Sequence, residues 1–272
     1  MYDIDVDLGE IYKESEIHKE THIPSIVFIV PYRDREEHYR RFSEHMKYIL
    51  ADVNGYKIYY IHQCDDRGFN RGAMKNIGFR VVKNKWPEDY KKITLVFNDI
   101  DCMPKTPGLL NYQTVPNRIK HFYGFRHTLG GIVSINAGDF EKINGFPNFW
   151  TWGYEDNMFQ TRAQNAGILI DRSQFYGILD QSILRLPQNN IRPVNKTEFD
   201  RYANGTKEGI LQISDLEYSV NEYTGFVDVS NFITGTQELT ANTTNYDLIN
   251  GPVPFKHFFS RRKFTSIKMQ IM

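Results

Sequence analysis

Apolar runs alternate with helix-like segments along the first hundred residues. The runs at 25–30 and 93–97 are continuous and apolar, which is typical of buried strands, and 56–61 also predicts a strand. Between them, apolar residues recur at helical spacing within 39–50 and 74–81. This alternation predicts an α/β fold with right-handed βαβ units, a mostly parallel central sheet and helices on both faces.

Local signals suggest where these elements begin and end. Pro31 is expected to stop the first strand, and Asp34 and Glu37 have capping-box spacing before the first helix. A later helix is predicted from about Glu155 to Ala166, with Gly167 as its stop. We expect an N-terminal arm at 1–22, a catalytic domain at 23–218, and a C-terminal extension of strands and loops at 219–272 packed on the core.

Polar clusters follow each of the three predicted strands. In mostly parallel sheets, ligands bind beyond the carboxyl ends of the strands. The clusters at 31–35, 64–71 and 98–101 should therefore converge on one crevice. The first two carry arginines, which can bind phosphate bidentately, and aromatic residues that can flank a base.

Two pairs of carboxylates are candidates for chemistry. Asp99 and Asp101 directly follow a strand, where they could hold Mg²⁺ or Mn²⁺ together with substrate phosphates, although a solvated acidic loop is an equal alternative. Glu155 and Asp156 stand at a predicted helix start, where acidic residues also favour the helix dipole. Trp150 and Trp152 beside them favour a sugar site, because a sugar pocket combines apolar walls with a few polar groups.

Composition narrows the class of protein. Lys plus Arg equals Asp plus Glu at 33 each, so no net field favours nucleic acid or an anionic membrane. Cys64 and Cys102 are too few for a disulfide framework, and no apolar segment predicts a signal peptide or an integral membrane anchor. We therefore expect a cytoplasmic protein of viral or microbial source, and a Golgi lumen only if an anchor precedes this sequence. The sequons at Asn195, Asn204 and Asn242 carry little weight.

Six ordered blocks resemble the beta-1,4-galactosyltransferase family, glycosyltransferase family 7, over about residues 24–218. They are VPYRDREEH, FNRGAMKNIGF, FNDIDCMP, GGIVSI, INGFPN and WTWGYEDNMFQTR. The resemblance implies a GT-A fold and an inverting transfer of galactose, N-acetylgalactosamine or a related sugar. The donor would be a UDP-sugar, the acceptor a glycan or glycoconjugate, and the cofactor a divalent cation, Mn²⁺ before Mg²⁺.

The resemblance also implies roles for particular residues. Asp156 would be the catalytic base and would hold the acceptor together with Trp152 and Glu155, while Asp101 and Asp99 would serve the metal. The residues implied at the donor are Pro31, Tyr32, Arg33, Arg35, Phe69, Arg71, Asp99, Thr128, Gly130 and Gly131. The two glycines would let the backbone approach the donor sugar.

The chain departs from the family at two points. The stretch 175–181 lacks the histidine that usually completes the metal shell, and Asp180 is the candidate substitute. Thr128 stands where galactose-using members often have Tyr, which leaves more room at the donor sugar. A sugar-binding protein without catalysis is therefore an alternative, although Glu155 and Asp156 are both kept. A nucleotidyltransferase would share Asp99 and Asp101 but gives no reason for the W-x-W-G-x-E-D block.

Overall fold

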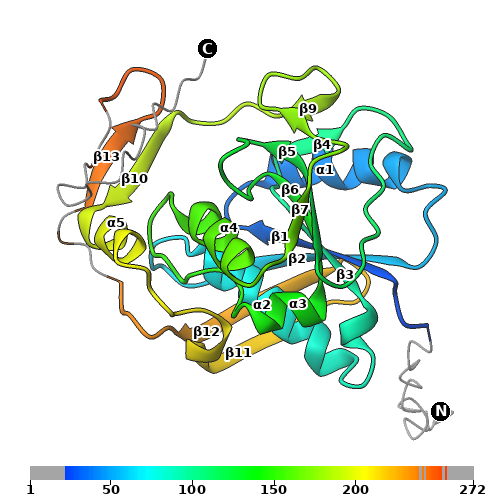
Figure 1. Ribbon diagram of the computed structural model, residues 1–272, viewed down its shortest axis with the longest axis horizontal. Helices are drawn as coiled ribbons and strands as arrows, with labels where there is room; N and C mark the ends of the chain where they lie inside the picture. Colours follow the sequence, from blue (N-terminus) through cyan, green and yellow to red (C-terminus); the bar gives the residue numbers. More distant parts are fainter. Residues whose placement is uncertain (1–21, 239–240, 242, 253–254, 256–272) are drawn as a thin grey trace, which may run out of the picture.

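A nine-stranded mixed sheet forms the centre of the fold (Figure 1). The computed structural model describes residues 22–238, 241, 243–252 and 255. The strands run in the order β11-β12-β2-β1-β3-β6-β5-β7, and β8 also pairs with β5. Their bounds are β1 (Ile26–Tyr32), β2 (Tyr56–Gln63), β3 (Thr94–Asn98), β5 (Arg118–Gly124), β6 (Ile132–Asn136), β7 (Leu169–Asp171), β8 (Tyr176–Gly177), β11 (Ser214–Val220) and β12 (Phe226–Ile233).

Helices cover the sheet, and two short strand pairs stand beside it. The helices are α1 (Glu36–Ile49), α2 (Arg71–Lys85), α3 (Ala137–Lys142), α4 (Glu155–Asn165) and α5 (Lys196–Ala203), with 3-10 turns η1 (Tyr90–Lys92) and η2 (Ile210–Gln212). The pairs are β4 (Cys102–Pro104) with β9 (Ile183–Arg185), and β10 (Ile191–Asn195) with β13 (Thr243–Asp247). Figure 1 places α5, β10 and β13 together to one side of the sheet.

The strand directions agree with the mostly parallel sheet that the sequence predicts. β1 runs parallel to both β2 and β3, and β2 is also parallel to β12. β6 is antiparallel to β3 and to β5, and β11 is antiparallel to β12. Because β1, β2 and β3 point the same way, the polar clusters that follow them emerge at one edge.

The central strand β1 is buried on both faces, as its apolar run predicts. Val27 and Ile29 enter the core cluster that includes side chains of α2, α3 and α4, whereas Phe28 and Val30 enter the cluster that includes those of α1. Side chains of a strand alternate between its faces, so only a continuous apolar run can serve both clusters.

Two local predictions near the first helix are wrong. β1 continues through Pro31, which is tolerated because the ladder to β3 ends at Ile29 while that to β2 continues. Helix α1 begins after Arg35 and has no side-chain cap. Asp34 instead adopts a positive φ of 51°, and Glu37 accepts hydrogen bonds from the arginines at 40 and 41.

The later boundaries follow the sequence in part. Helix α4 ends before Gly167, whose φ of +71° suits the predicted stop. Apart from His22, the predicted arm at 1–22 lies outside the described residues. The boundary predicted at residue 218 falls inside β11, which forms the sheet edge with β12, so the division into domain and extension stays a prediction.

Candidate active site

A cavity of about 1510 Å³ opens at the carboxyl ends of β1 and β3. All three polar clusters contribute to its wall, as does the start of α4. The sequence-predicted residues that line it are Pro31, Arg33, Arg35, Phe69, Arg71, Asp99, Asp101, Thr128, Gly130, Gly131, Trp152, Glu155 and Asp156.

Two predicted residues are not brought to this cavity. Tyr32 packs edge-on against Tyr39, His62 and Phe226 and does not line the wall. Asp180 is exposed, and its Oδ1 accepts a hydrogen bond from the Ser182 backbone N–H at 2.8 Å. The structure therefore gives Asp180 no place in a metal shell at Asp101.

Arg33, Phe69 and Arg71 form one part of the wall. The Arg33 and Arg71 guanidinium carbons lie 5.3 and 5.9 Å from the centroid of the Phe69 ring. Arg33 also donates to the backbone carbonyls of Asp65 and Arg67, which fixes its orientation. An aromatic ring with two guanidinium groups nearby suits a planar base that carries phosphates.

The carboxylates of Asp99 and Asp101 are close to the end of β3, while Ile100 between them is buried in the core. Burial, and then the neighbouring Asp99, raise the pKa of Asp101 to about 6, although Arg35 and Arg185 oppose the shift. The Arg35 Nη1 atom is 4.0 Å from Asp101 Oδ2, too far for a hydrogen bond. A divalent cation would relieve the repulsion between the two carboxylates.

The metal-ligating atoms of Asp99 and Asp101 fit an ion that arrives together with a substrate. Within the described residues, no third His, Cys, Asp or Glu completes a metal cluster with Asp99 and Asp101. Mg²⁺ and similar hard cations are commonly held by one or two carboxylates plus substrate phosphates and water. Two strand-end carboxylates are therefore sufficient if a diphosphate supplies further oxygen ligands.

A buried ion-pair network holds the second carboxylate pair. Arg71 Nε donates to Glu155 Oε1 at 3.0 Å, and Lys75 Nζ donates to Asp156 Oδ1 at 3.1 Å. Arg71 and Lys75 lie one turn apart on α2, so one helix face serves both carboxylates at the start of α4. Glu155 Oε2 and Arg71 Nη2 are buried and lack hydrogen-bond partners among the described residues. These two atoms can receive a ligand's hydroxyl or oxygen.

The network separates the pKa values of its two carboxyls. Burial, opposed by Lys75 and aided by Glu155 and Asp99, raises the pKa of Asp156 to about 7. Burial also acts to raise the pKa of Glu155, but Arg71 and Lys75 outweigh it and hold that pKa below its ordinary value. A carboxylate whose pKa lies near neutrality is suited to act as a general base, and Asp156 is therefore the better candidate.

The glycine pair has structural reasons of its own, and its expected role at the donor sugar stays a prediction. A Cβ on Gly130 would lie 2.2 Å from Asp156 Oδ2, and Gly131 has a φ of +75°. Gly130 is thus required by the carboxylate itself, and Gly131 by the backbone turn. Thr128 lines the cavity, and its hydroxyl donates to the Phe125 carbonyl at 3.4 Å.

The two tryptophans of the W-x-W block have separate roles. Trp152 lines the cavity, whereas Trp150 is 2% exposed and belongs to the core. The Trp150 ring stacks on Phe232, and its indole N–H donates to the Thr236 carbonyl. The expectation that Trp150 helps to form a sugar site is therefore wrong, because its ring is enclosed.

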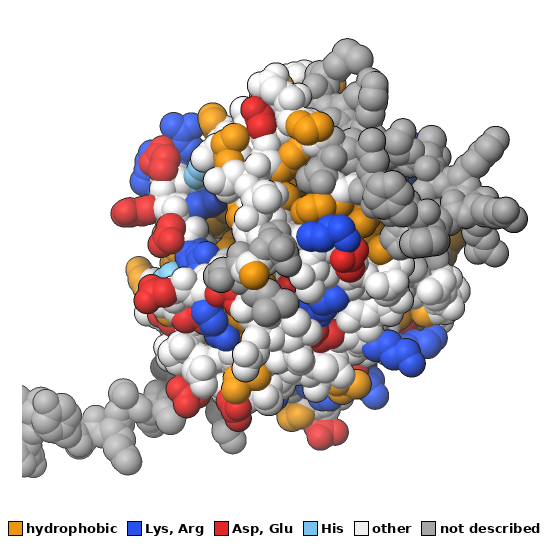
Figure 2. Space-filling view, turned by 90° about the vertical axis from the view of Figure 1, so that its left-hand side faces the viewer, with side chains coloured by type: hydrophobic (Ala, Val, Ile, Leu, Met, Phe, Trp, Pro, Cys, Tyr) orange, Lys and Arg blue, Asp and Glu red, His pale blue; other side chains and the backbone are white. Residues whose placement is uncertain are grey.

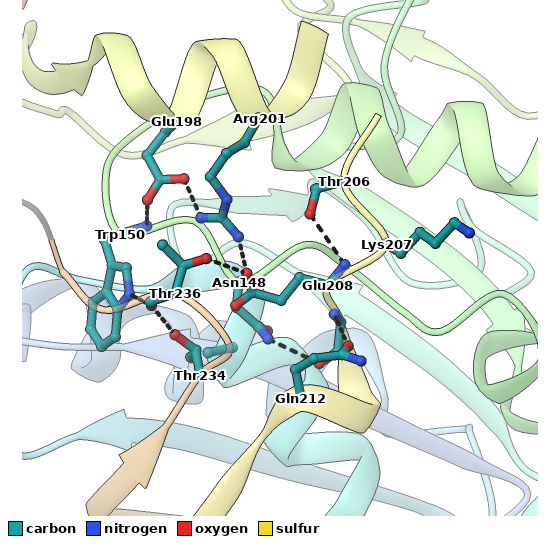
Figure 3. Close-up of polar contacts among 12 residues, drawn as sticks. Asn148, Trp150, Glu198, Arg201, Thr206, Lys207, Glu208, Gln212, Thr234 and Thr236 are labelled. Carbon is teal, nitrogen blue, oxygen red and sulfur yellow. Dashed lines mark hydrogen bonds and ion pairs between the residues drawn. The ribbon is translucent and has the colours of Figure 1, made fainter. Parts of the chain in front are cut away.

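A buried polar network anchors the segment that leads to Trp152 (Figure 3). Glu198 of α5 accepts from the Trp150 backbone N–H and from Arg201, and Arg201 also pairs with Glu208. The network thereby ties the W-x-W block to α5 and to the loop before η2. These bonds fix the segment that leads to Trp152, although Glu208 Oε1 is buried without a partner among the described residues.

Several residues at the cavity were not found by sequence reasoning. Lys75 is 2% exposed, and its spacing of four from Arg71 was the available signal. Arg185 and Arg192 also line the cavity, and burial together with Arg71, Arg35 and Arg185 lowers the pKa of Arg192. Other aromatic side chains complete this wall: Tyr154 from the same block as Trp152, and Phe199, Tyr202, Tyr246 and Phe255 from distant segments.

The surface beside this site carries both signs of charge. Figure 2 shows Lys and Arg side chains next to Asp and Glu on the face that bears α5, β10 and β13. This mixture agrees with the balanced composition. None of the described helices is long and apolar enough to cross a membrane.

Two family models match consecutive parts of the chain. The N-terminal region of glycosyl transferase group 7 matches residues 5–111, and the N-terminal domain of galactosyltransferase matches residues 113–182. Together they cover most of the segment that contains the six blocks.

Curated relatives match the chain over part of their length. Xylosylprotein 4-beta-galactosyltransferase of Caenorhabditis elegans is 32% identical over 164 residues, which are 56% of this chain and 55% of the relative. Beta-1,4-galactosyltransferase 1 of Bos taurus is 29% identical over 211 residues, which are 72% of this chain and 50% of the relative. The chain thus spans about half the length of the curated relatives it matches.

Two solved structures share the fold. The catalytic domain of Drosophila beta-1,4-galactosyltransferase 7 in complex with xylobiose has a TM-score of 0.64 at 22% identity, over 79% of this chain and 96% of that chain. A mutant of that enzyme in complex with manganese, UDP-Gal and xylobiose has a TM-score of 0.61 at 21% identity, with the same coverage. The expected GT-A fold is confirmed.

Proposed function

Because the chain belongs to the beta-1,4-galactosyltransferase family, glycosyltransferase family 7, we propose that it is an inverting glycosyltransferase. It moves a sugar from a UDP-sugar to a hydroxyl of a carbohydrate acceptor. One observation carries the proposal: Asp99, Asp101 and six of the described arginines line the same cavity as Asp156, which is paired with Lys75. A cytoplasmic location stays a prediction.

The donor is assigned to the arginine-rich side. Phe69 with Arg33 contacts the base, and Arg35, Arg71, Arg185 and Arg192 surround the diphosphate. The lowered pKa of Arg192, caused by burial and by its arginine neighbours, supports an anion there, because a bound diphosphate would offset their repulsion. Asp99 and Asp101 would hold Mn²⁺ or Mg²⁺, which supplies positive charge at the phosphate oxygens.

The acceptor is assigned to the Trp152 side. Glu155 Oε2, buried and without a partner in the described chain, accepts one acceptor hydroxyl, and the Trp152 ring packs on the sugar face. Asp156 takes the proton of the attacking hydroxyl. The new bond forms between that oxygen and the anomeric carbon, and the bond from this carbon to the phosphate oxygen breaks with its electron pair leaving on UDP.

The test is UDP release from a panel of UDP-sugars, measured with and without carbohydrate acceptors. Acceptor-stimulated release from one donor supports transfer. If the protein binds a UDP-sugar but releases no UDP in the presence of any acceptor, it is a sugar-binding protein and the proposal is overturned. Pyrophosphate release from UTP and a sugar phosphate would instead indicate nucleotidyl transfer.

Replacing Asp101 with Ala is expected to remove both activity and its dependence on divalent cations. In the unmodified protein, chelator should weaken UDP-sugar binding, because the diphosphate would lose the ion shared with Asp99 and Asp101. Calorimetric titration of UDP with and without chelator measures this, with Asp180→Ala as a control that should behave like wild type. Full activity in chelator would contradict a metal at this site.

Replacing Thr128 with Tyr is expected to raise discrimination against a donor with a bulky C2 substituent. A steric change of this kind is commonly worth about 1–3 kcal/mol, or roughly 10–200-fold in relative specificity. The measurement is the ratio of kcat/KM for UDP-N-acetylgalactosamine and UDP-galactose. An unchanged ratio would place Thr128 away from the donor sugar.

A further inference from the structure

Three side chains with metal-ligating atoms meet outside the cavity. His62 of β2 and Asp228 of β12 are partners in the parallel register of these strands, and Cys64 follows β2 two residues after His62. Residues two apart on an extended chain point to the same face, so His62 and Cys64 both face the Asp228 side chain. None of the three lines the cavity that contains Asp99 and Asp101.

Their ligand atoms are close together. His62 Nδ1 is 2.8 Å from Asp228 Oδ1 and 3.4 Å from Cys64 Sγ, and Cys64 Sγ is 3.9 Å from Asp228 Oδ1. Within the part of the chain that the structure describes, no other group of three His, Cys, Asp or Glu residues has ligand atoms gathered in this way.

We propose that His62, Cys64 and Asp228 form a second metal site, which binds Zn²⁺ through one nitrogen, one sulfur and one oxygen. Zn²⁺ is borderline soft and accepts all three ligand types, typically in a tetrahedron, and a water molecule takes the fourth position. A hard ion such as Mg²⁺ is disfavoured by the thiolate and the imidazole.

The geometry needs only a small adjustment to hold this ion. Zn–N and Zn–O distances near 2.1 Å and a Zn–S distance near 2.3 Å place tetrahedral ligand atoms about 3.4–3.6 Å apart. The His62–Cys64 pair already meets this separation, and the His62–Asp228 pair must open by roughly 0.6 Å on the same geometry. The side chains of His62 and Asp228 are 29% and 49% exposed, so they can move apart and the ion can enter from solvent.

The site stands next to the donor side of the cavity. The His62 ring packs edge-on against Tyr32 at 5.2 Å, and Tyr32 precedes Arg33. Cys64 begins the loop that leads to Phe69 and Arg71. An ion bound here would fix the start of that loop against β12. The site thus serves a structural role, and it does not depend on the proposed glycosyl transfer.

The test is a titration of the metal-free full-length protein with Zn²⁺ in the absence of UDP-sugar, followed with a competing chromophoric chelator. We expect the wild-type protein to bind one Zn²⁺ ion tightly. Removing a direct ligand in Cys64→Ser, His62→Gln or Asp228→Asn should weaken binding by at least about 10–100-fold, the loss seen when an outer-shell partner is removed. His38→Gln, at a half-buried histidine of α1 outside this cluster, is the matched control and should still bind one Zn²⁺ ion.

Two further measurements keep the assignment specific. Co²⁺ substitution should give a thiolate-to-cobalt absorption band that is absent in Cys64→Ser. The Asp99→Asn/Asp101→Asn double variant should still bind one Zn²⁺ ion tightly. This result distinguishes the new site from the metal site proposed at Asp99 and Asp101. Equal Zn²⁺ affinity in wild type and all three ligand variants would overturn the proposal, as would a cobalt band that survives in Cys64→Ser.

Discussion

Replacing Asp156 with Asn is expected to lower kcat by about 10²–10⁴-fold, the usual contribution of a general base. Asparagine keeps the shape of the side chain beside Gly130 but cannot accept the proton of the acceptor hydroxyl. Donor affinity should stay nearly unchanged, because the Asp156 carboxylate pairs with Lys75 and is not among the groups assigned to the diphosphate.

Steady-state kinetics and UDP titration of the same preparation measure the two effects separately. Asp89→Asn is a suitable control, since this carboxylate pairs with Lys92 outside the cavity. The thermal melting curve verifies that the Asp156 variant is folded despite the loss of the partner of Lys75. A kcat within about twofold of wild type would exclude Asp156 as the base, given the magnitude expected.

Replacing Lys75 with Met is expected to shift the pH dependence of the reaction. Asp156 must be unprotonated to act, so kcat/KM of wild type should fall as the pH drops through the raised pKa of about 7. Lys75 favours the charged carboxylate, whereas Glu155 and Asp99 disfavour it. Without the ammonium group, the pKa of Asp156 rises further. The acidic limb of the plot of kcat/KM against pH should then move up by about 1–3 pH units.

The pH profile of kcat/KM for wild type and variant measures this shift. Activity of the variant at neutral pH should be low and should recover in part as the pH increases, which a purely structural defect would not reproduce. Lys83→Met is the matched control, because Lys83 lies two turns further along α2 and pairs with Glu141 outside the cavity. Superimposable profiles would contradict the role of Lys75.

The sequence by itself determined the sheet, the crevice and the charged residues that follow its central strands. Continuous apolar runs such as that of β1 can be satisfied only between two layers, so the α/β architecture follows from the pattern. Because β1 and β3 are parallel, the residues after each strand, including Arg33 and Asp101, had to meet at one edge. Glu155 and Asp156 were visible as an acidic helix start beside Trp152.

Only the tertiary structure decided how these residues are paired. Lys75 is an ordinary helical lysine in the sequence, and only the packing of α2 against the start of α4 brings its ammonium group to Asp156. Trp150 and Trp152 look alike in the sequence, yet the stacking on Phe232 makes one of them a core residue. Arg192 and Asp228 reach their sites from segments more than 90 residues after Asp99. Such long-range contacts depend on how distant elements pack, which local propensity and periodicity do not encode.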